Sequence, residues 1–234
     1  MTRLFGRRVA EKASVQYPLI EQQVDRIVVR EDRSPRFVFV GTQFEIKGGG
    51  ALLRAWPSVV KAIPGAHLDL VTHLPAAFAD LVTAPGIALH DAKFSRDLIW
   101  SRFLREADVL VLPSYYESFG MIALEALSHG LALIVTDVFA LPELVVEGFN
   151  GSLIHPPVSV WDNGVPTPLH YSSQLLIDTV RALDTSAFED DLAKAMISLG
   201  RDPDALLLAR QNSLHLFKSR FDGRGGPRPL RMSL

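Results

Sequence analysis

The chain has 234 residues, and its 24 Lys and Arg against 26 Asp and Glu give a formal net charge of −2. A composition of 48% hydrophobic and 21% charged residues is typical of a globular protein, and the near-neutral charge argues against a nucleic-acid-binding protein with a broad basic face. The length fits one α/β domain with a remainder, because two such domains need on the order of 300–400 residues. The chain contains no Cys, which excludes disulfides, a thiolate nucleophile and zinc held by Cys.

No apolar run approaches the roughly 20 residues that cross a membrane. The basic N-terminus is not followed by an apolar core, so we expect no secretory signal. These features predict a cytoplasmic protein without a transmembrane segment, which reaches a membrane surface only through another domain or a partner.

In chain order, residues 1–36 are polar and irregular, and we interpret them as a connecting segment. Beyond them, short apolar runs typical of buried parallel strands alternate with helical patterns. The expected strands are 37–40, 68–71, 87–89, 108–112, 132–135 and 152–154. The expected helices between them are 51–63, 75–83, 95–105, 119–129 and 141–146. This alternation predicts an α/β fold with a Rossmann-like, doubly wound parallel sheet, which binds ligands beyond the carboxyl ends of its strands.

A Pro-rich loop is expected over 155–168, where Trp161 is given no role. Three helices are expected over 173–183, 188–199 and 203–221. The predicted domain therefore spans 37–221, and the tail 222–234 is expected to be flexible.

The loop and helix after the strand 108–112 carry the most informative pattern. Gly120 lets a ligand approach the backbone, and the first turn of the following helix offers free N–H groups and the positive end of its dipole to an anion. Glu117 precedes this helix, and Glu125 lies about two turns along it. A carboxylate at Glu125 is suited to accept two ribose hydroxyls.

The string ESFGMIALE, from Glu117 to Glu125, resembles the E-x7-E motif of the group 1 family of retaining nucleotide-sugar glycosyltransferases. Four further blocks resemble the family in the same order: FVFVGTQFEIKGG, ADVLVLPS, TDVFALPELV and EGFNG. EALSHG, which overlaps the end of the motif, also resembles the family. The resemblance extends from about Val15 to Phe221. It implies a GT-B fold, in which a C-terminal donor-binding domain faces an acceptor-binding domain, and this chain resembles the donor-binding half.

The resemblance also implies roles for single residues. Lys47 binds the donor diphosphate, Glu125 accepts the ribose hydroxyls, and Glu117 contacts the sugar as the catalytic carboxylate. The remaining donor-binding positions are loop and backbone groups at Gly41, Thr42, Ser118, Phe119, Gly120 and Met121. The family works without a bound cofactor and usually without a metal, and the His residues of this chain show no metal spacing.

Some positions depart from the family pattern. Thr42 stands where many members carry an Arg that binds the diphosphate. Phe139, Ala140 and Leu141 precede Pro142-Glu143 where two Gly are common. Thr72-His73 replaces a Gly after the second strand, and the predicted base pocket over 91–94 also lacks a Gly.

Each candidate also has a purely structural interpretation. Lys47 is then a solvated surface residue, Glu117 supports the helix N-terminus, and Glu125 pairs with His129 at i,i+4. Trp56 and Phe103 lie at helical spacing and are expected in the core.

The sequence thus predicts a hexosyltransferase-type retaining domain that binds a nucleotide-diphosphate sugar and has weak or no activity alone, because an acceptor-binding domain or subunit is missing. The alternatives are a degenerate or split-enzyme binding subunit without activity of its own, and half of a sugar-nucleotide epimerase. A nucleic-acid partner is not expected.

Overall fold

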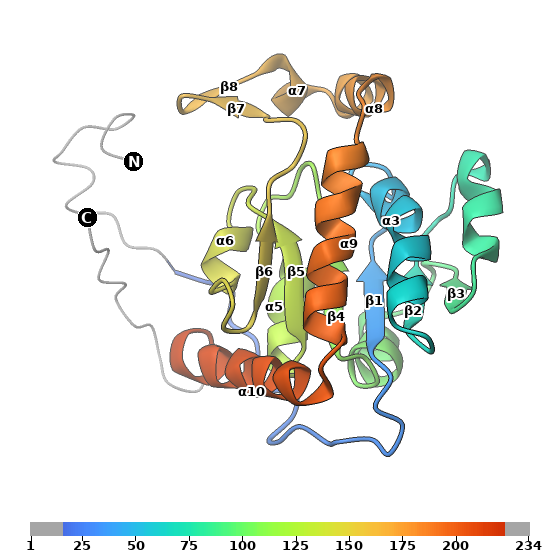
Figure 1. Ribbon diagram of the computed structural model, residues 1–234. Helices are drawn as coiled ribbons and strands as arrows, with labels where there is room; N and C mark the ends of the chain where they lie inside the picture. Colours follow the sequence, from blue (N-terminus) through green and yellow to red (C-terminus); the bar gives the residue numbers. More distant parts are fainter. Residues whose placement is uncertain (1–15, 223–234) are drawn as a thin grey trace, which may run out of the picture.

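The computed structural model describes residues 16–222, which form a six-stranded parallel sheet in the order β3-β2-β1-β4-β5-β6 (Figure 1). The strands are β1 (Arg36–Val40), β2 (His67–Val71), β3 (Ile87–His90), β4 (Val109–Leu112), β5 (Ala132–Thr136) and β6 (Gly151–Ile154). The strand order reverses between β1 and β4, which makes their carboxyl ends the expected ligand-binding edge. The predicted Rossmann-like α/β fold is confirmed.

The centre of the sheet is apolar on both faces. Every residue of β4 and β5 is buried, and β1 is aligned on β4 with Val38 opposite Leu110. Such continuous apolar runs suit parallel strands, because helices cover both faces and remove them from water.

Two helical layers cover the sheet. On one face lie α3 (Gly49–Ala62), α8 (Ser173–Ala182) and α9 (Ser186–Gly200), and on the other lie α5 (Met121–Ser128) and α6 (Leu141–Leu144). The helix α10 (Pro203–Arg220) contributes to both cores, with Leu206 in the first and Phe217 in the second. Trp56 of α3 is fully buried in the first core, and Phe103 is buried in the second. Both expected core positions are therefore confirmed.

Two of the expected helices have other geometries. Residues Ala76–Thr83 form a 3₁₀ helix, η1. The expected helix over 95–105 is a short α-helix, α4 (Arg96–Leu98), which continues as a π-helix, η2 (Ile99–Leu104). Ser95 caps α4 as predicted, because its hydroxyl accepts the N–H of Leu98 at 3.3 Å.

The prediction of an irregular loop over 155–168 is wrong. It contains a hairpin of β7 (Trp161–Asp162) and β8 (Val165–Pro166), followed by α7 (Pro168–Tyr171). Asn163 and Gly164 form the turn with φ of 49° and 82°, the backbone that a two-residue hairpin requires. The Asn-Gly pair in the sequence indicates such a hairpin turn, but the Pro-rich composition of the segment favoured a loop. The hairpin and α7 lie at the end of the molecule toward which the sheet strands point (Figure 1).

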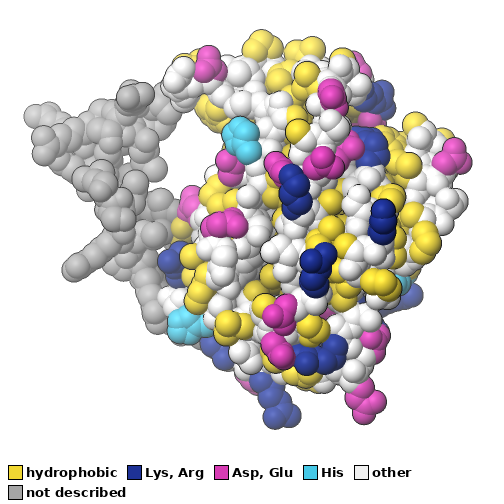
Figure 2. Space-filling view, viewed as in Figure 1, with side chains coloured by type: hydrophobic (Ala, Val, Ile, Leu, Met, Phe, Trp, Pro, Cys, Tyr) yellow, Lys and Arg dark blue, Asp and Glu magenta, His cyan; other side chains and the backbone are white. Residues whose placement is uncertain are grey.

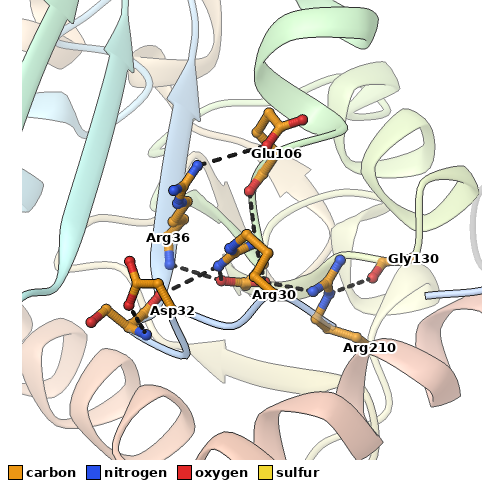
Figure 3. A network of polar contacts seen from close by, with 8 residues as sticks. Arg30, Asp32, Arg36, Glu106, Gly130 and Arg210 are labelled. Atoms are coloured by element: carbon orange, nitrogen blue, oxygen red, sulfur yellow. Dashed lines mark hydrogen bonds and ion pairs between the residues drawn. The ribbon is translucent and has the colours of Figure 1, made fainter. Parts of the chain in front are cut away.

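A buried charge network closes the opposite end of the sheet. Asp108 accepts hydrogen bonds from Arg30 and from Arg210 of α10, both at 2.5 Å, and from the backbone N–H of Arg36 at 2.9 Å. Figure 3 shows Arg30 of the N-terminal segment and Arg210 of α10 in this network, with the side chain of Arg36 directed toward Glu106. The network fixes residues far apart in the chain against the start of β4.

The residues before β1 lie against the domain without forming a helix between 16 and 35. Ile20 makes a single bridge with Asp222, and the N–H of Gln23 donates to the carbonyl of Ser128 at 3.0 Å. The boundary between the connecting segment 1–36 and the domain 37–221 stays a prediction. Residues 1–15 and 223–234, which include nearly all of the expected flexible tail, lie outside the described residues.

Candidate functional site

Two loops meet at the carboxyl ends of β1 and β4. The N–H of Tyr115 donates to the carbonyl of Ile46 at 2.9 Å, which joins the loop 41–48 to the loop 114–120. Gly48 has φ 74°, and a Cβ on it would lie 2.0 Å from the carbonyl oxygen of Pro113. The two loops therefore approach each other as closely as only a glycine allows.

The sequence candidates Lys47 and Glu117 are in direct contact. The Lys47 Nζ lies 2.7 Å from Glu117 Oε2 and also donates to the carbonyl of Tyr116 at 3.3 Å. The two side chains are only 18% and 11% exposed. Lys47 is thus not the freely solvated residue of the structural interpretation.

Gly41 and Thr42 lie at the start of the same loop. Gly41 is held on both sides, because its N–H donates to the carbonyl of Val71 at 3.0 Å and its own carbonyl accepts the hydroxyl of Thr72 at 2.6 Å. Thr42 is exposed. The Thr72 that replaces a family glycine therefore anchors this loop.

The helix α5 begins beside the pair. It starts at Met121, two residues later than predicted, because Gly120 adopts the left-handed conformation with φ 84°. A Cβ on Gly120 would lie 2.4 Å from Leu141 Cδ2. The N–H of Ser118, in the loop before α5, donates to Glu117 Oε1 at 3.1 Å, but no side chain among the described residues caps the helix start itself. Phe119 is half-buried there.

Met121 opens α5 with a 36% exposed side chain. In the first turn the N–H groups of Ala123 and Leu124 donate to the carbonyl of Gly120, whereas those of Met121 and Ile122 precede the first carbonyl of the helix, at the positive end of its dipole. An anionic group is the ligand that such a helix start favours.

Glu125 lies on α5 away from the Lys47–Glu117 pair. Its carboxylate binds Arg96 at 2.6 Å and the indole N–H of Trp100 at 3.0 Å. The structural alternative, in which this side chain pairs with His129, is wrong, because His129 Nδ1 hydrogen-bonds the backbone carbonyl of Glu125 at 2.8 Å instead. The carboxylate turns toward the crossover from β3, which supplies both of its partners.

Sequence reasoning missed Arg96, Trp100 and Ser114. The guanidinium of Arg96 lies 4.6 Å from the centre of the Trp100 ring, a cation–π contact that holds both against Glu125. Ser114 is fully buried at the end of β4, and its hydroxyl has no hydrogen-bond partner among residues 16–222. Only the position of Ser114, two residues after a predicted strand, could have singled it out.

Two cavities open elsewhere in the described part of the chain. One of about 660 Å³ lies between residues 23–30 and η2, and one of about 400 Å³ lies between α3, α8 and α9. Neither is lined by Lys47 or Glu117. Between residues 16 and 222, no three His, Asp or Glu side chains are grouped as metal ligands, and no helix there is both long and apolar enough to cross a bilayer.

Residues 34–161 match the model of the family described as glycosyl transferases group 1. The chain belongs to this family. The matched range includes both loops, the Lys47–Glu117 pair, α5 and Glu125.

Relatives at the sequence level carry related names. An alpha-maltose-1-phosphate synthase of Mycolicibacterium smegmatis is 34% identical over 113 residues, 47% of this chain and 23% of the relative. An uncharacterized glycosyltransferase of Methanocaldococcus jannaschii is 30% identical over 135 residues, 54% of this chain and 33% of the relative. The alignments thus span only about a quarter to a third of these curated relatives.

Solved structures share the fold of this group 1 glycosyltransferase domain. The C-terminal domain of LpcC, a group 1 glycosyl transferase of Francisella tularensis, has a TM-score of 0.60 at 19% identity, over 87% of this chain and 99% of that one. Anabaena HepE in complex with UDP and glucose has a TM-score of 0.57 at 17% identity, over 81% of this chain and 45% of that one. S. aureus TarM, crystallised with UDP, fondaparinux and alpha-GlcNAc-glycerol, has a TM-score of 0.65 at 11% identity, over 93% of this chain and 39% of that one.

Proposed function

We propose that this domain binds a nucleotide-diphosphate sugar and is the donor half of a retaining glycosyltransferase. The observation that carries the proposal is the contact between Lys47 and Glu117 at the edge where β1 and β4 end, beside the start of α5. This edge is where doubly wound sheets bind nucleotides.

The charges at this edge suit a diphosphate. Lys47 supplies a cation, and the first turn of α5 supplies N–H donors. Glu117 holds the Lys47 ammonium in place at 2.7 Å, so the cation is positioned before a ligand arrives. During transfer the bond between the anomeric carbon and the diphosphate oxygen breaks, and the electron pair leaves with the diphosphate. A hydroxyl oxygen of the acceptor bonds to the anomeric carbon in its place, and the proton of that hydroxyl passes to the leaving diphosphate. Preorganised donors stabilise that developing charge, and we propose that they do so without a metal.

We propose that Glu125 binds the nucleoside end of the donor. It is buried on α5 with Arg96 and Trp100 as partners, on the side of β4 that faces the crossover from β3. A carboxylate with a fixed orientation accepts vicinal ribose hydroxyls. HepE and TarM, which share the fold, were crystallised with UDP, and this supports a nucleoside diphosphate as the ligand class.

We further propose that acceptor binding needs a second domain or a partner subunit, on the far side of the donor. The domain alone would then bind a donor and transfer its sugar weakly or not at all, because acceptor positioning and exclusion of water depend on a closed cleft.

A binding subunit without activity is the second candidate. It is favoured by the exposed Thr42, which supplies no cation, and by the pairing of Lys47 with a carboxylate, which lowers the net positive charge of the site. Transfer assays with the acceptor-binding partner present would separate the two candidates, since only the first predicts turnover.

The proposal is tested by titration calorimetry of the chain with UDP-, GDP- and ADP-sugars and with the matching nucleoside diphosphates. We expect one base to be bound at micromolar to millimolar concentration. Absence of binding to every member of the panel at millimolar concentration would overturn the proposed function.

A further inference from the structure

An aromatic cluster lies over the carboxyl ends of β4, β5 and β6. It consists of Tyr116, Phe139, Trp161 and His170, with ring centres 4.8 Å apart for Tyr116–Phe139 and for Trp161–His170, and 5.4 Å apart for Tyr116–His170. Three separate segments supply the rings: the loop after β4, the loop after β5, and the hairpin with α7 after β6. The cluster is thus built by the tertiary structure rather than by one motif.

The cluster is open to solvent. Trp161 is 37% exposed, and the other three rings are half-buried. Figure 2 shows hydrophobic side chains exposed at this end of the molecule, over β7, β8 and α7. A ring cluster that served only to pack a core would be closed, whereas this one presents aromatic surface beyond the strand ends.

Phe139 is held in an unfavourable backbone conformation. Its φ is 51°, and among residues 16–222 the only other non-glycine residue with positive φ is Asn163 in the hairpin turn. Asn tolerates this region and Phe does not. A strained residue that persists at a ligand-binding edge motivates a functional hypothesis, and here the strain directs an aromatic ring into the cluster.

The cluster is continuous with the proposed diphosphate site. Tyr116 precedes Glu117, and its carbonyl accepts the Lys47 ammonium at 3.3 Å. Leu141, two residues after Phe139, lies against Gly120 at the start of α5. The same two loops therefore hold both the charged pair and the aromatic rings.

The order of groups along the edge defines what the cluster can bind. Glu125 and its partners lie toward the crossover from β3, the Lys47–Glu117 pair lies at the ends of β1 and β4, and the cluster lies toward β5 and β6. In a nucleotide sugar, the sugar follows the diphosphate on the side away from the nucleoside. The group that reaches the cluster is therefore a sugar ring.

His170 adds a polar group to the aromatic surface. Its Nδ1 is buried and has no hydrogen-bond partner among the described residues. Small-molecule sites combine apolar and aromatic walls with a few polar groups that fix orientation. Aromatic faces match the C–H face of a hexose, and the imidazole nitrogen matches a hydroxyl.

From these observations we infer that Tyr116, Phe139, Trp161 and His170 form the subsite for the sugar ring of the donor and determine its sugar specificity. This inference rests on the proposed function, because it places the ring next to a diphosphate bound at Lys47.

The test compares binding of a nucleotide sugar with binding of its nucleoside diphosphate. Trp161→Ala and Phe139→Gly are titrated with UDP and UDP-glucose, or with the GDP or ADP pair if the wild-type chain prefers that base. Loss of one stacking ring is expected to weaken nucleotide-sugar binding about 3- to 10-fold and to leave nucleoside-diphosphate binding unchanged. Val165→Ala, on the same hairpin, 63% exposed and outside the cluster, is the matched control and should change neither.

Thermal unfolding of each variant shows whether it is folded. Trp161 lies on an exposed two-residue strand, whereas Phe139→Gly relieves the strain of a left-handed backbone. The two variants should therefore differ in stability, and their ligand affinities would differ in the same way if lost stability caused the weaker binding. Equal weakening of both ligands, or no change in either, would overturn the subsite while the proposed function stands. Failure of the wild-type chain to bind any nucleoside diphosphate or nucleotide sugar would overturn the proposed function and the subsite together.

Discussion

The ammonium of Lys47 and the carboxylate of Glu117 lie 2.7 Å apart, although 70 positions separate them in the chain. They meet because β1 and β4 are neighbours in the sheet, and each residue follows the carboxyl end of its strand within a short loop. The pair places a fixed cation where the proposed donor carries its diphosphate.

Replacement of Lys47 tests whether its ammonium group binds the donor diphosphate. We expect Lys47→Met to weaken nucleoside-diphosphate binding about 10- to 100-fold, because a charge-assisted hydrogen bond to the ligand is lost. Lys194→Met, which removes a 73% exposed lysine of α9, is the matched control for net charge. Calorimetric titration measures both, and equal affinities of the two variants would contradict the diphosphate assignment.

Two variants distinguish a ligand-binding role of Glu125 from a purely structural role. We expect Glu125→Gln to weaken nucleoside-diphosphate binding about 10-fold, since the amide accepts hydroxyls less well than a carboxylate. Arg96→Met removes the ion partner and leaves the carboxylate, so its effect on affinity should be smaller. Titration of both variants decides the matter, because a purely structural Glu125 would leave the affinity of the folded protein unchanged in each.

The start of α5 depends on a residue without a side chain. Gly120→Ala should destabilise the fold by about 2–4 kcal/mol, because it adds the strain of a left-handed alanine and a clash with Leu141. Gly148→Ala is the control: Gly148 has φ 69° and no atom within 4 Å of an added Cβ, so this variant carries the strain alone. Urea unfolding gives both values. A cost for Gly120→Ala no larger than for the control would show that Leu141 moves aside without penalty.

The charge network at the opposite end of the sheet is expected to be structural. Asp108→Asn leaves Arg30 and Arg210 without their shared carboxylate and should lower the free energy of unfolding by about 3–5 kcal/mol. Asp204→Asn removes an 84% exposed carboxylate that pairs with Arg33 and should have a much smaller effect. Urea unfolding compares the two, and a small loss for Asp108→Asn would mean that the arginines reach water or other acceptors.

The stability of the fold should fall as the pH decreases from about 7 to 5. Burial lowers the pKa of His129 below its usual value of 6.5. In this window the unfolded chain therefore binds a proton that the folded chain does not, and unfolding is favoured as the pH falls. His129→Asn should flatten this part of the dependence, measured as unfolding free energy against pH. His155→Asn, at an 85% exposed site, should leave it in place. An unchanged slope in His129→Asn would assign the effect to other groups.

The sequence by itself determined the alternation of strands and helices, because continuous apolar runs such as 108–112 and 132–135 are stable only when buried on both faces. It also determined which loops follow the strands, and hence that Lys47, Glu117 and Gly120 lie at one edge of the sheet. The family blocks added expected roles at these positions, and the family itself is confirmed.

Only the tertiary structure decided how these side chains are partnered. Glu125 turns to Arg96 and Trp100 rather than to His129, because the crossover from β3 packs against α5. Phe139 and Trp161 meet because their segments follow the adjacent strands β5 and β6. Contacts of this kind depend on which strands are neighbours and how the connections pack, and periodicity along one chain carries no information about either.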